Sequence, residues 1–216
     1  MVVYRCQATS VGGFVQQLAV AYLGHGYWFY VTGQIPEGKD PRLVDQKLVA
    51  LYGIDISKWS RARRKRAGVA NVQHLRHGRF FVLLATHGTH RFFGDEARSI
   101  RDARRTPIRF RGYSVSFRAG HPHVRICQEV YKRIKSHFVE IALHRSAENL
   151  AEELGRIRFE PYAPVRRQLL NILRAVNRCR KRASFQPVPS TCLFLKRRIY
   201  KPFGSVDVPN RADDET

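Results

Sequence analysis

The sequence is short of acidic residues and contains no long apolar run. Its 216 residues carry 17 acidic against 39 basic side chains, which gives a formal net charge of +22 and a pI near 10.8. No apolar run reaches the roughly 18 residues that a membrane-spanning helix needs, so we expect no membrane partner. Hydrophobic residues still make up 44% of the chain, which argues for one sizeable core and against intrinsic disorder, a coiled coil or collagen.

The chain also lacks the short motifs of several enzyme and metal-binding classes. Its four cysteines, Cys6, Cys127, Cys179 and Cys192, form no C-x-x-C pair, so they predict free thiols and not a zinc knuckle. Neither G-x-x-x-x-G-K nor G-x-S-x-G occurs, which argues against an NTPase and a serine hydrolase. The N-terminal stretch 11–23 contains two glutamines that interrupt the pattern of a signal peptide, so we expect a cytoplasmic location.

Arginine is the residue that the sequence has in excess. It supplies most of the 39 basic side chains, and its planar guanidinium binds phosphate bidentately and stacks on bases. The charge is concentrated at 58–66 and 166–182, which contain no acid, and at 98–118, which contains only Asp102. This pattern predicts a polyanionic partner, most simply nucleic acid, bound with salt-dependent affinity. The expected contact residues are Lys58, Arg61, Arg63, Arg64, Lys65, Arg66, Arg104, Arg105, Arg109, Arg111, Arg167, Arg174, Arg178 and Lys181.

The first half of the chain predicts an α+β unit with an antiparallel sheet. Aromatic and β-branched residues at 27–35 predict a strand, and Asp40 followed by Pro41 predicts a helix that ends at Gly53. The other expected elements are a short amphipathic helix at 11–23, a charged linker at 57–66, two strands joined at His77–Gly78, a helix at 94–104, and strands at 108–118 and 123–127. The order from residue 27 is that of the split β-α-β plan of ferredoxin-like folds.

From Gln128 the pattern changes to helix. Apolar residues at helical spacing predict helices that begin near Gln128, Ser146 and Pro164, and the last of these carries arginines on its outer side. A late strand is expected at 192–203. The expected domains are a ferredoxin-like core at 1–127, a basic helical extension at 128–206 and a flexible acidic tail at 207–216.

Two segments of the first half resemble a known family. FYVTGQIP at 29–36 and HGRFFVLL at 77–84 resemble the first-strand and third-strand motifs of RNA recognition motif domains. In that family, exposed aromatic side chains on these two strands stack on unpaired bases. The resemblance covers about residues 27–118, and it implies that Tyr30 and Phe81 stack on bases.

The nine histidines predict a second possibility, a small endonuclease. His121-Pro-His123 resembles the paired-histidine strand of single-strand-nicking nucleases, in which two histidines hold a divalent metal and a tyrosine attacks phosphate. This resemblance implies Mg²⁺ or Mn²⁺ at the histidine pair and Tyr131 as the nucleophile. A metal-free endonuclease with a histidine base is a further alternative, and His87 and His90 are the other candidate catalytic residues.

Taken together, these patterns favour a nucleic-acid-binding protein without a cofactor and without catalytic activity. We expect it to bind RNA or single strands in preference to duplex DNA, as part of a ribonucleoprotein or as an accessory component of a mobile element. The endonuclease is the first alternative. The second alternative is a basic assembly subunit that docks onto an acidic protein partner.

Overall fold

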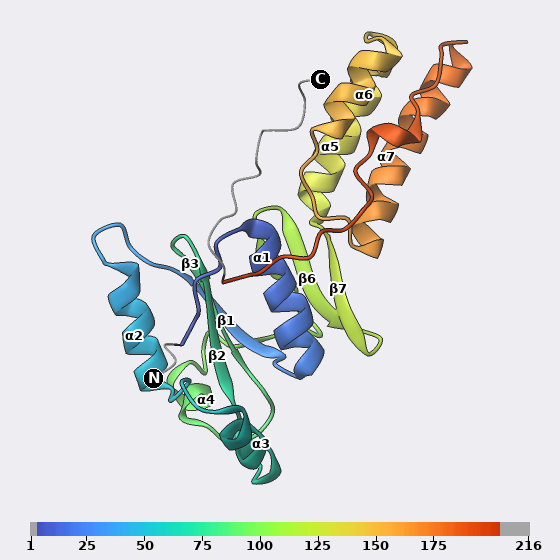
Figure 1. Ribbon diagram of the computed structural model, residues 1–216. Helices are drawn as coiled ribbons and strands as arrows, with labels where there is room; N and C mark the ends of the chain where they lie inside the picture. Colours follow the sequence, from blue (N-terminus) through green and yellow to red (C-terminus); the bar gives the residue numbers. More distant parts are fainter. Residues whose placement is uncertain (1–3, 204–216) are drawn as a thin grey trace, which may run out of the picture. The chain divides into compact units, whose positions relative to one another are not determined.

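A computed structural model describes residues 4–203 of the protein, and the predicted tail at 207–216 lies outside them (Figure 1). The described residues form a mixed α+β structure with antiparallel sheets, as predicted. Within them the chain divides into a first unit (4–106, 117–122 and 199–203) and a second unit (107–116 and 123–198). The domain boundaries expected at 127 and 206 stay a prediction.

The sheet of the first unit has the strand order β2-β3-β1-β4, and each neighbouring pair is antiparallel. Strands β2 and β3 meet at the predicted turn, where Gly78 has a φ of 60°. That conformation is open to glycine at little cost. The strands are β1 (Phe29–Gln34), β2 (Val72–His77), β3 (Phe80–Ala85) and β4 (Arg101–Asp102).

Helices lie on both faces of this sheet (Figure 1). The predicted N-terminal helix is present as α1 (Val11–Gln16), which continues as a π-helical segment to Tyr22, and Phe14 of α1 packs edge-on against Phe80 of β3 with ring centroids 5.8 Å apart. The opposite face is covered by α2 (Pro41–Leu51), which the Asp40 side chain caps as expected. Apolar residues of the first unit are therefore buried on both sides of the strands.

The segment expected to be a charged linker at 57–66 is a helix, α3 (Lys58–Arg66). Its N-terminus is capped by Ser57, whose hydroxyl accepts a hydrogen bond from the Ser60 amide at 3.1 Å. Arg61 and Arg64 reach back to the carbonyls of Ile56 and Gly53, at 2.8 and 3.3 Å. The linker prediction was wrong because repulsion between solvated cations is weak beside a cap and these backbone contacts.

The prediction of a helix at 94–104 is also wrong. The structure has a short helix α4 (Arg91–Asp95), and the chain then enters the sheet as β4. Ala103, which follows β4, is fully buried, and its amide donates to the carbonyl of Trp28. This tertiary contact outweighs the local helical pattern.

Residues 199–203 belong to the first unit and form no strand, contrary to the strand expected at 192–203. The Gln16 side chain binds both backbone groups of Tyr200, at 2.8 and 3.1 Å, and the Thr9 amide donates to the carbonyl of Pro202. Gln16 lies on α1 and Thr9 in the loop before it, so residues 199–203 have no neighbouring strand with which to form β-sheet hydrogen bonds. Gly12 makes the approach possible, because a Cβ there would lie 2.5 Å from Cζ of Tyr200.

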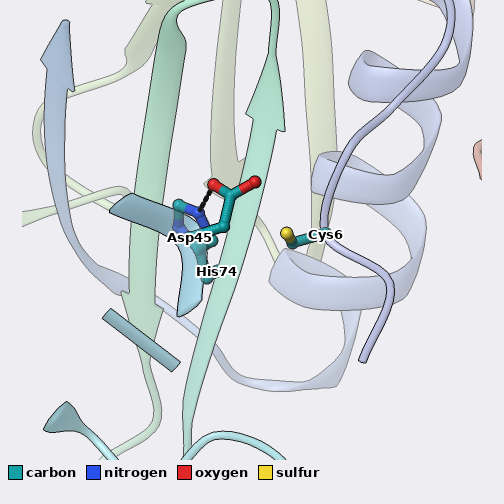
Figure 2. A group of neighbouring side chains, drawn as sticks. All are labelled: Cys6, Asp45 and His74. Carbon is teal, nitrogen blue, oxygen red and sulfur yellow. Dashed lines mark hydrogen bonds and ion pairs between the residues drawn. The ribbon is translucent and has the colours of Figure 1, made fainter. Parts of the chain in front are cut away.

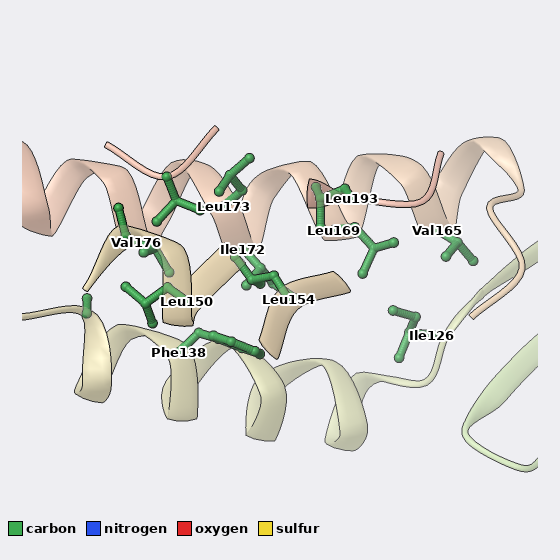
Figure 3. Close-up of a cluster of buried hydrophobic side chains, with 13 residues drawn as sticks. Ile126, Phe138, Leu150, Leu154, Val165, Leu169, Ile172, Leu173, Val176 and Leu193 are labelled. Carbon is green, nitrogen blue, oxygen red and sulfur yellow. The ribbon is translucent and has the colours of Figure 1, made fainter. Parts of the chain in front are cut away.

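The second unit contains the three helices predicted from apolar spacing, and their inner faces form one apolar cluster. Figure 3 shows Phe138, Leu150 and Ile172 of this cluster, one from each helix. The buried Gln168 side chain bonds to both the amide and the carbonyl of Ile126 and so fixes the last helix to the preceding strand. The elements from residue 108 onward, of which 117–122 count with the first unit, are β5 (Ile108–Phe110), β6 (Tyr113–Arg118), β7 (His121–Ile126), α5 (Gln128–Glu140), α6 (Ala147–Gly155) and α7 (Ala163–Arg182). Across residues 4–203, no helix has the length and hydropathy needed to cross a bilayer.

Candidate nucleic-acid interface

Helix α3 presents an exposed basic face in the first unit. Lys58, Arg63, Lys65 and Arg66 are exposed, and no residue of the helix is buried. The helix contains no acidic residue, so these cations have no carboxylate partner within it. Such a face attracts a polyanion at long range, and a nucleic acid bound there releases its condensed counterions.

Trp59 is the most informative residue of α3, and it was not among the contact residues expected from the sequence. Its side chain is 79% exposed, although burial of an indole releases more free energy than burial of most side chains. Trp59, Arg63 and Arg66 are spaced i, i+4 and i+7, so they share one side of the helix. The available signal in the sequence was one large aromatic residue inside a basic run.

Two cations of this stretch have structural contacts as well. Arg61 and Arg64 are half-buried and donate to the backbone carbonyls of the preceding turn. The carbonyl of Arg61 also accepts from the Asn71 side chain at 3.0 Å. We therefore assign the contact surface of α3 to its exposed cations and to Trp59.

Helix α7 carries a second exposed basic face, in the second unit. Arg167, Arg174, Arg178 and Lys181 are all exposed, as expected, and their spacing of 7, 4 and 3 residues places them in one stripe. At 1.5 Å per residue this stripe is about 21 Å long. The helix has no acidic residue, and its opposite side packs into the apolar cluster.

No protein-family model matches the chain, and no curated protein matches it. The function is therefore inferred from the residues and geometry of this chain.

The expected contact residues between 98 and 118 are partly neutralised. Arg104 forms an ion pair with Asp102 at 2.7 Å, and its guanidinium lies 4.5 Å from the ring centroid of Trp28. Arg109 forms an exposed ion pair with Glu129 at 3.1 Å. Arg105 and Arg111 are exposed, and the latter occupies the β5–β6 turn with a φ of 45°. This stretch forms no single acid-free face comparable to those of α3 and α7.

The structure does not place Tyr30 and Phe81 on a common stacking platform. In the β1–β3 register Tyr30 pairs with Leu84 and Gly33 pairs with Phe81, so the two aromatic rings point to opposite faces of the sheet. Tyr30 is only 2% exposed, and its hydroxyl donates to the carbonyl of Thr106. Phe81 lies over Gly33, where a Cβ would come within 2.5 Å of the ring. As placed, these rings serve packing within the first unit.

The candidate catalytic histidines have local structural contacts. His90 caps α4, because its Nδ1 accepts from the Phe92 amide at 3.1 Å, and burial together with the nearby Arg64 lowers its pKa. His87 is exposed and lies near the ring of Phe29. His90 thus has a role as a helix cap, and a catalytic role for either histidine stays a prediction.

The predicted metal pair of a nicking nuclease has no third ligand beside it within residues 4–203. His121 is exposed, and its Nδ1 lies 2.8 Å from the carbonyl of Ala119 in the β6–β7 turn. His123 is half-buried. Tyr131, the expected nucleophile, is half-buried and packs against the apolar cluster of the second unit.

One buried group of possible metal donors does occur in the described chain, formed by Cys6, Asp45 and His74 (Figure 2). The three side chains come from the N-terminal segment, α2 and β2. His74 Nε2 lies 2.7 Å from Oδ1 of Asp45, and Arg76 donates to both oxygens of the same carboxylate at 2.9 Å. Burial raises the pKa of the Cys6 thiol to about 12, so it stays protonated. Because a guanidinium already occupies the carboxylate, we assign this group to stability and not to metal binding.

Proposed function

We propose that the protein binds single-stranded nucleic acid, RNA or DNA, through the exposed faces of α3 and α7. The observation that supports this proposal most directly is the Trp59 side chain, which is 79% exposed on α3, a helix with four exposed cations and no acidic residue. Arginine and lysine neutralise phosphates, while an exposed aromatic plane stacks on a base. A duplex keeps the faces of its bases inside the stack, so this combination favours a single strand.

Two finer assignments belong to the same proposal. We place the first unit among the ferredoxin-like folds, which the strand order β4-β1-β3-β2 and its antiparallel pairing support. We also propose a cytoplasmic role in a ribonucleoprotein or as an accessory component of a mobile element. The four cysteines, all within the described residues, are unpaired, which suits a reducing compartment.

Fluorescence anisotropy with a labelled RNA strand, the DNA strand of the same sequence and the DNA duplex tests the proposal. Trp59→Ala should weaken single-strand binding about 5- to 150-fold, which corresponds to the roughly 1–3 kcal/mol of one stacked base, and should change duplex binding little. Leu43→Ala is the control, because Leu43 is 63% exposed on α2 of the same unit. Equal, small effects of the two substitutions would refute a stacking role for Trp59.

A salt titration tests the phosphate contacts. The double variant Arg63→Gln/Arg66→Gln should reduce the slope of log K against log salt by about 0.7 for each phosphate that the helix no longer neutralises. Arg42→Gln/Lys47→Gln removes the same charge from exposed positions on α2 and should leave the slope nearer to that of the parent. If both pairs lower the slope equally, the effect is one of net charge, and α3 is not the interface.

The same mixtures distinguish the other two hypotheses. Strands incubated with Mg²⁺, Mn²⁺ or chelator should stay intact; metal-dependent nicking with a covalent protein adduct would instead support the nuclease with His121, His123 and Tyr131. Absence of any binding to nucleic acid at low salt would favour a basic subunit that docks onto an acidic protein.

A further inference from the structure

A cavity of about 770 Å³ opens in the first unit beside the N-terminal end of α3. Three tyrosines, Tyr4, Tyr22 and Tyr27, line it together with the basic side chains of Arg5, His25 and Arg61. Its volume lies within the range of small-ligand sites, roughly 300–1,000 Å³. Tyr22 and Tyr27 are only 6% and 8% exposed, so these tyrosines form a largely buried aromatic wall, while the cations at the rim suit a phosphate.

The aromatic wall is held in place by hydrogen bonds. Gln73, which is buried, accepts from the hydroxyl of Tyr4 at 2.8 Å and donates to the hydroxyl of Tyr27 at 3.4 Å. The rings of Tyr22 and Tyr27 contact each other with centroids 5.8 Å apart. The tyrosines are thus fixed before a ligand arrives, which lowers the entropic cost of binding.

The charges around the cavity favour an anion that also offers hydrogen-bond donors. Arg5 is exposed at the rim, and Arg61 is half-buried with one nitrogen held by the carbonyl of Ile56. Asp55 is the acidic residue among those that line the cavity. Two arginines against one carboxylate leave a net positive site, and that carboxylate can accept from the exocyclic amine of a base.

The cavity adjoins the helix to which we assign strand binding. Ser57, the cap of α3, and Arg61, one turn further along, both line it. Trp59 lies between them in the sequence, on the first turn of the same helix. By helical spacing, Ser57 and Arg61 lie on the side of α3 opposite to Trp59, so a strand bound on the outer side reaches the opening around the N-terminal end of the helix.

We propose that this cavity holds one nucleotide unit, with the base among the tyrosines and the phosphate at Arg5 and Arg61. The proposal rests on the proposed function, because the nucleotide is supplied by the strand bound along α3. A free mononucleotide has the same base and phosphate groups, so the experiment distinguishes a nucleotide of the bound strand from a free one.

The test uses the full chain and an RNA strand that carries the fluorescent base 2-aminopurine at its 5′ end, at its 3′ end or in its middle. Ala21→Phe fills the cavity, because Ala21 lines it. Val20→Phe is the matched control, because Val20 is the preceding residue, is 47% exposed and does not line the cavity. Thermal melting shows whether each variant folds, and Arg5→Gln at the exposed rim provides a second variant that does not alter packing.

We expect quenching of 2-aminopurine at one position in the parent and in Val20→Phe, and loss of that quenching in Ala21→Phe. Arg5→Gln should weaken the quenched complex several-fold. Anisotropy should show that Ala21→Phe still binds the strand through α3. Quenching that is unchanged by Ala21→Phe, or absent at all three positions, overturns the cavity proposal alone, whereas loss of strand binding in the parent overturns the proposed function.

Free 2-aminopurine riboside monophosphate is the second arm of the experiment. Quenching of this free nucleotide by the parent, and not by Ala21→Phe, assigns the cavity to nucleotides independently of a strand. Quenching of the strand without quenching of the free nucleotide assigns it to the strand as the source. Equal quenching of the free nucleotide by the parent and Ala21→Phe places its binding elsewhere and contradicts the proposal.

Discussion

Replacement of Asp45 by Asn tests the buried ion pairs that join α2 to β2. Asp45 is 8% exposed and Arg76 only 3%, and both carboxylate oxygens accept hydrogen bonds from that guanidinium. Asn has nearly the same shape, so the substitution removes the charge and little volume. Arg76 is then left buried without a counter-ion.

The size of the effect follows from this burial. Removal of one partner of a buried ion pair costs about 3–5 kcal/mol, because the remaining charge is uncompensated. Arg76 keeps hydrogen bonds to the carbonyl of Gly78 at 2.6 Å and to the Gln7 side chain at 3.0 Å, so we expect the low end, about 3 kcal/mol. Asp95→Asn is the matched control. It breaks an exposed i, i+4 pair with Arg91 in the same unit, and we expect about 0.5 kcal/mol.

Urea denaturation followed by tryptophan fluorescence measures both free energies of unfolding. Both tryptophans, Trp28 and Trp59, belong to the first unit, and the half-buried Trp28 is the one whose surroundings change on unfolding. The slope of free energy against urea should stay the same in all three proteins. Equal losses for Asp45→Asn and Asp95→Asn would refute the assignment of the buried pair as a main contact of this unit.

The same pair predicts a dependence on pH. Burial alone would raise the pKa of Asp45, but hydrogen bonds from His74 and Arg76 lower it below its ordinary value of 3.8. A carboxyl whose folded-state pKa is lowered contributes stability above its unfolded-state pKa and loses it as the pH falls through the folded-state value. The parent should therefore lose stability below about pH 4, and Asp45→Asn should lose less over the same interval. Parallel curves for the two proteins would contradict this assignment.

Two further predictions concern the backbone. Gly12→Ala should destabilise the protein by about 1–3 kcal/mol, because the new Cβ meets the Tyr200 ring. The cost of Gly12→Ala should be clearly smaller in a Tyr200→Ala background. If urea denaturation shows that the losses of the two substitutions simply add, this contact is excluded. Ala119→Gly should stabilise the protein by up to about 1 kcal/mol, because Ala119 has a φ of 48° in the β6–β7 turn, where glycine is not strained. The control, Ala175→Gly inside α7, should instead cost about that amount. A lower melting temperature for Ala119→Gly would contradict backbone strain at Ala119.

The elements that the sequence predicts well are those with strong local signals. The Asp40–Pro41 cap and the apolar stripes of the last three helices match α2, α5, α6 and α7. The elements that it misses depend on contacts distant in the sequence. The hydrogen bond from the Ala103 amide to the Trp28 carbonyl favours β4 over the helical pattern, and the binding of Tyr200 by Gln16 leaves no strand at the end of the described chain.

The candidate site divides in the same way. Helical spacing alone places the cations of α7 in one exposed stripe, because the opposite side of that helix is strongly apolar. The aromatic pair Tyr30 and Phe81 depends on strand register, and a shift of one residue moves every side chain to the other face. A resemblance between short sequence motifs does not specify that register. Trp59 was missed because the surrounding charges predicted a linker and not a helix with a solvent face.

The return of residues 199–203 to the first unit has a consequence for the order in which the protein is made. Residues 4–106 leave the ribosome before residues 123–198, yet Gln16 and Tyr200, which bind each other, are separated by 184 positions. While the intervening chain is being synthesised, the surface at Gly12 that receives the Tyr200 ring stays open to solvent. The first unit therefore reaches its final stability only after the second unit has emerged, and a nascent chain stalled before Tyr200 would present an unfinished first unit to chaperones and proteases.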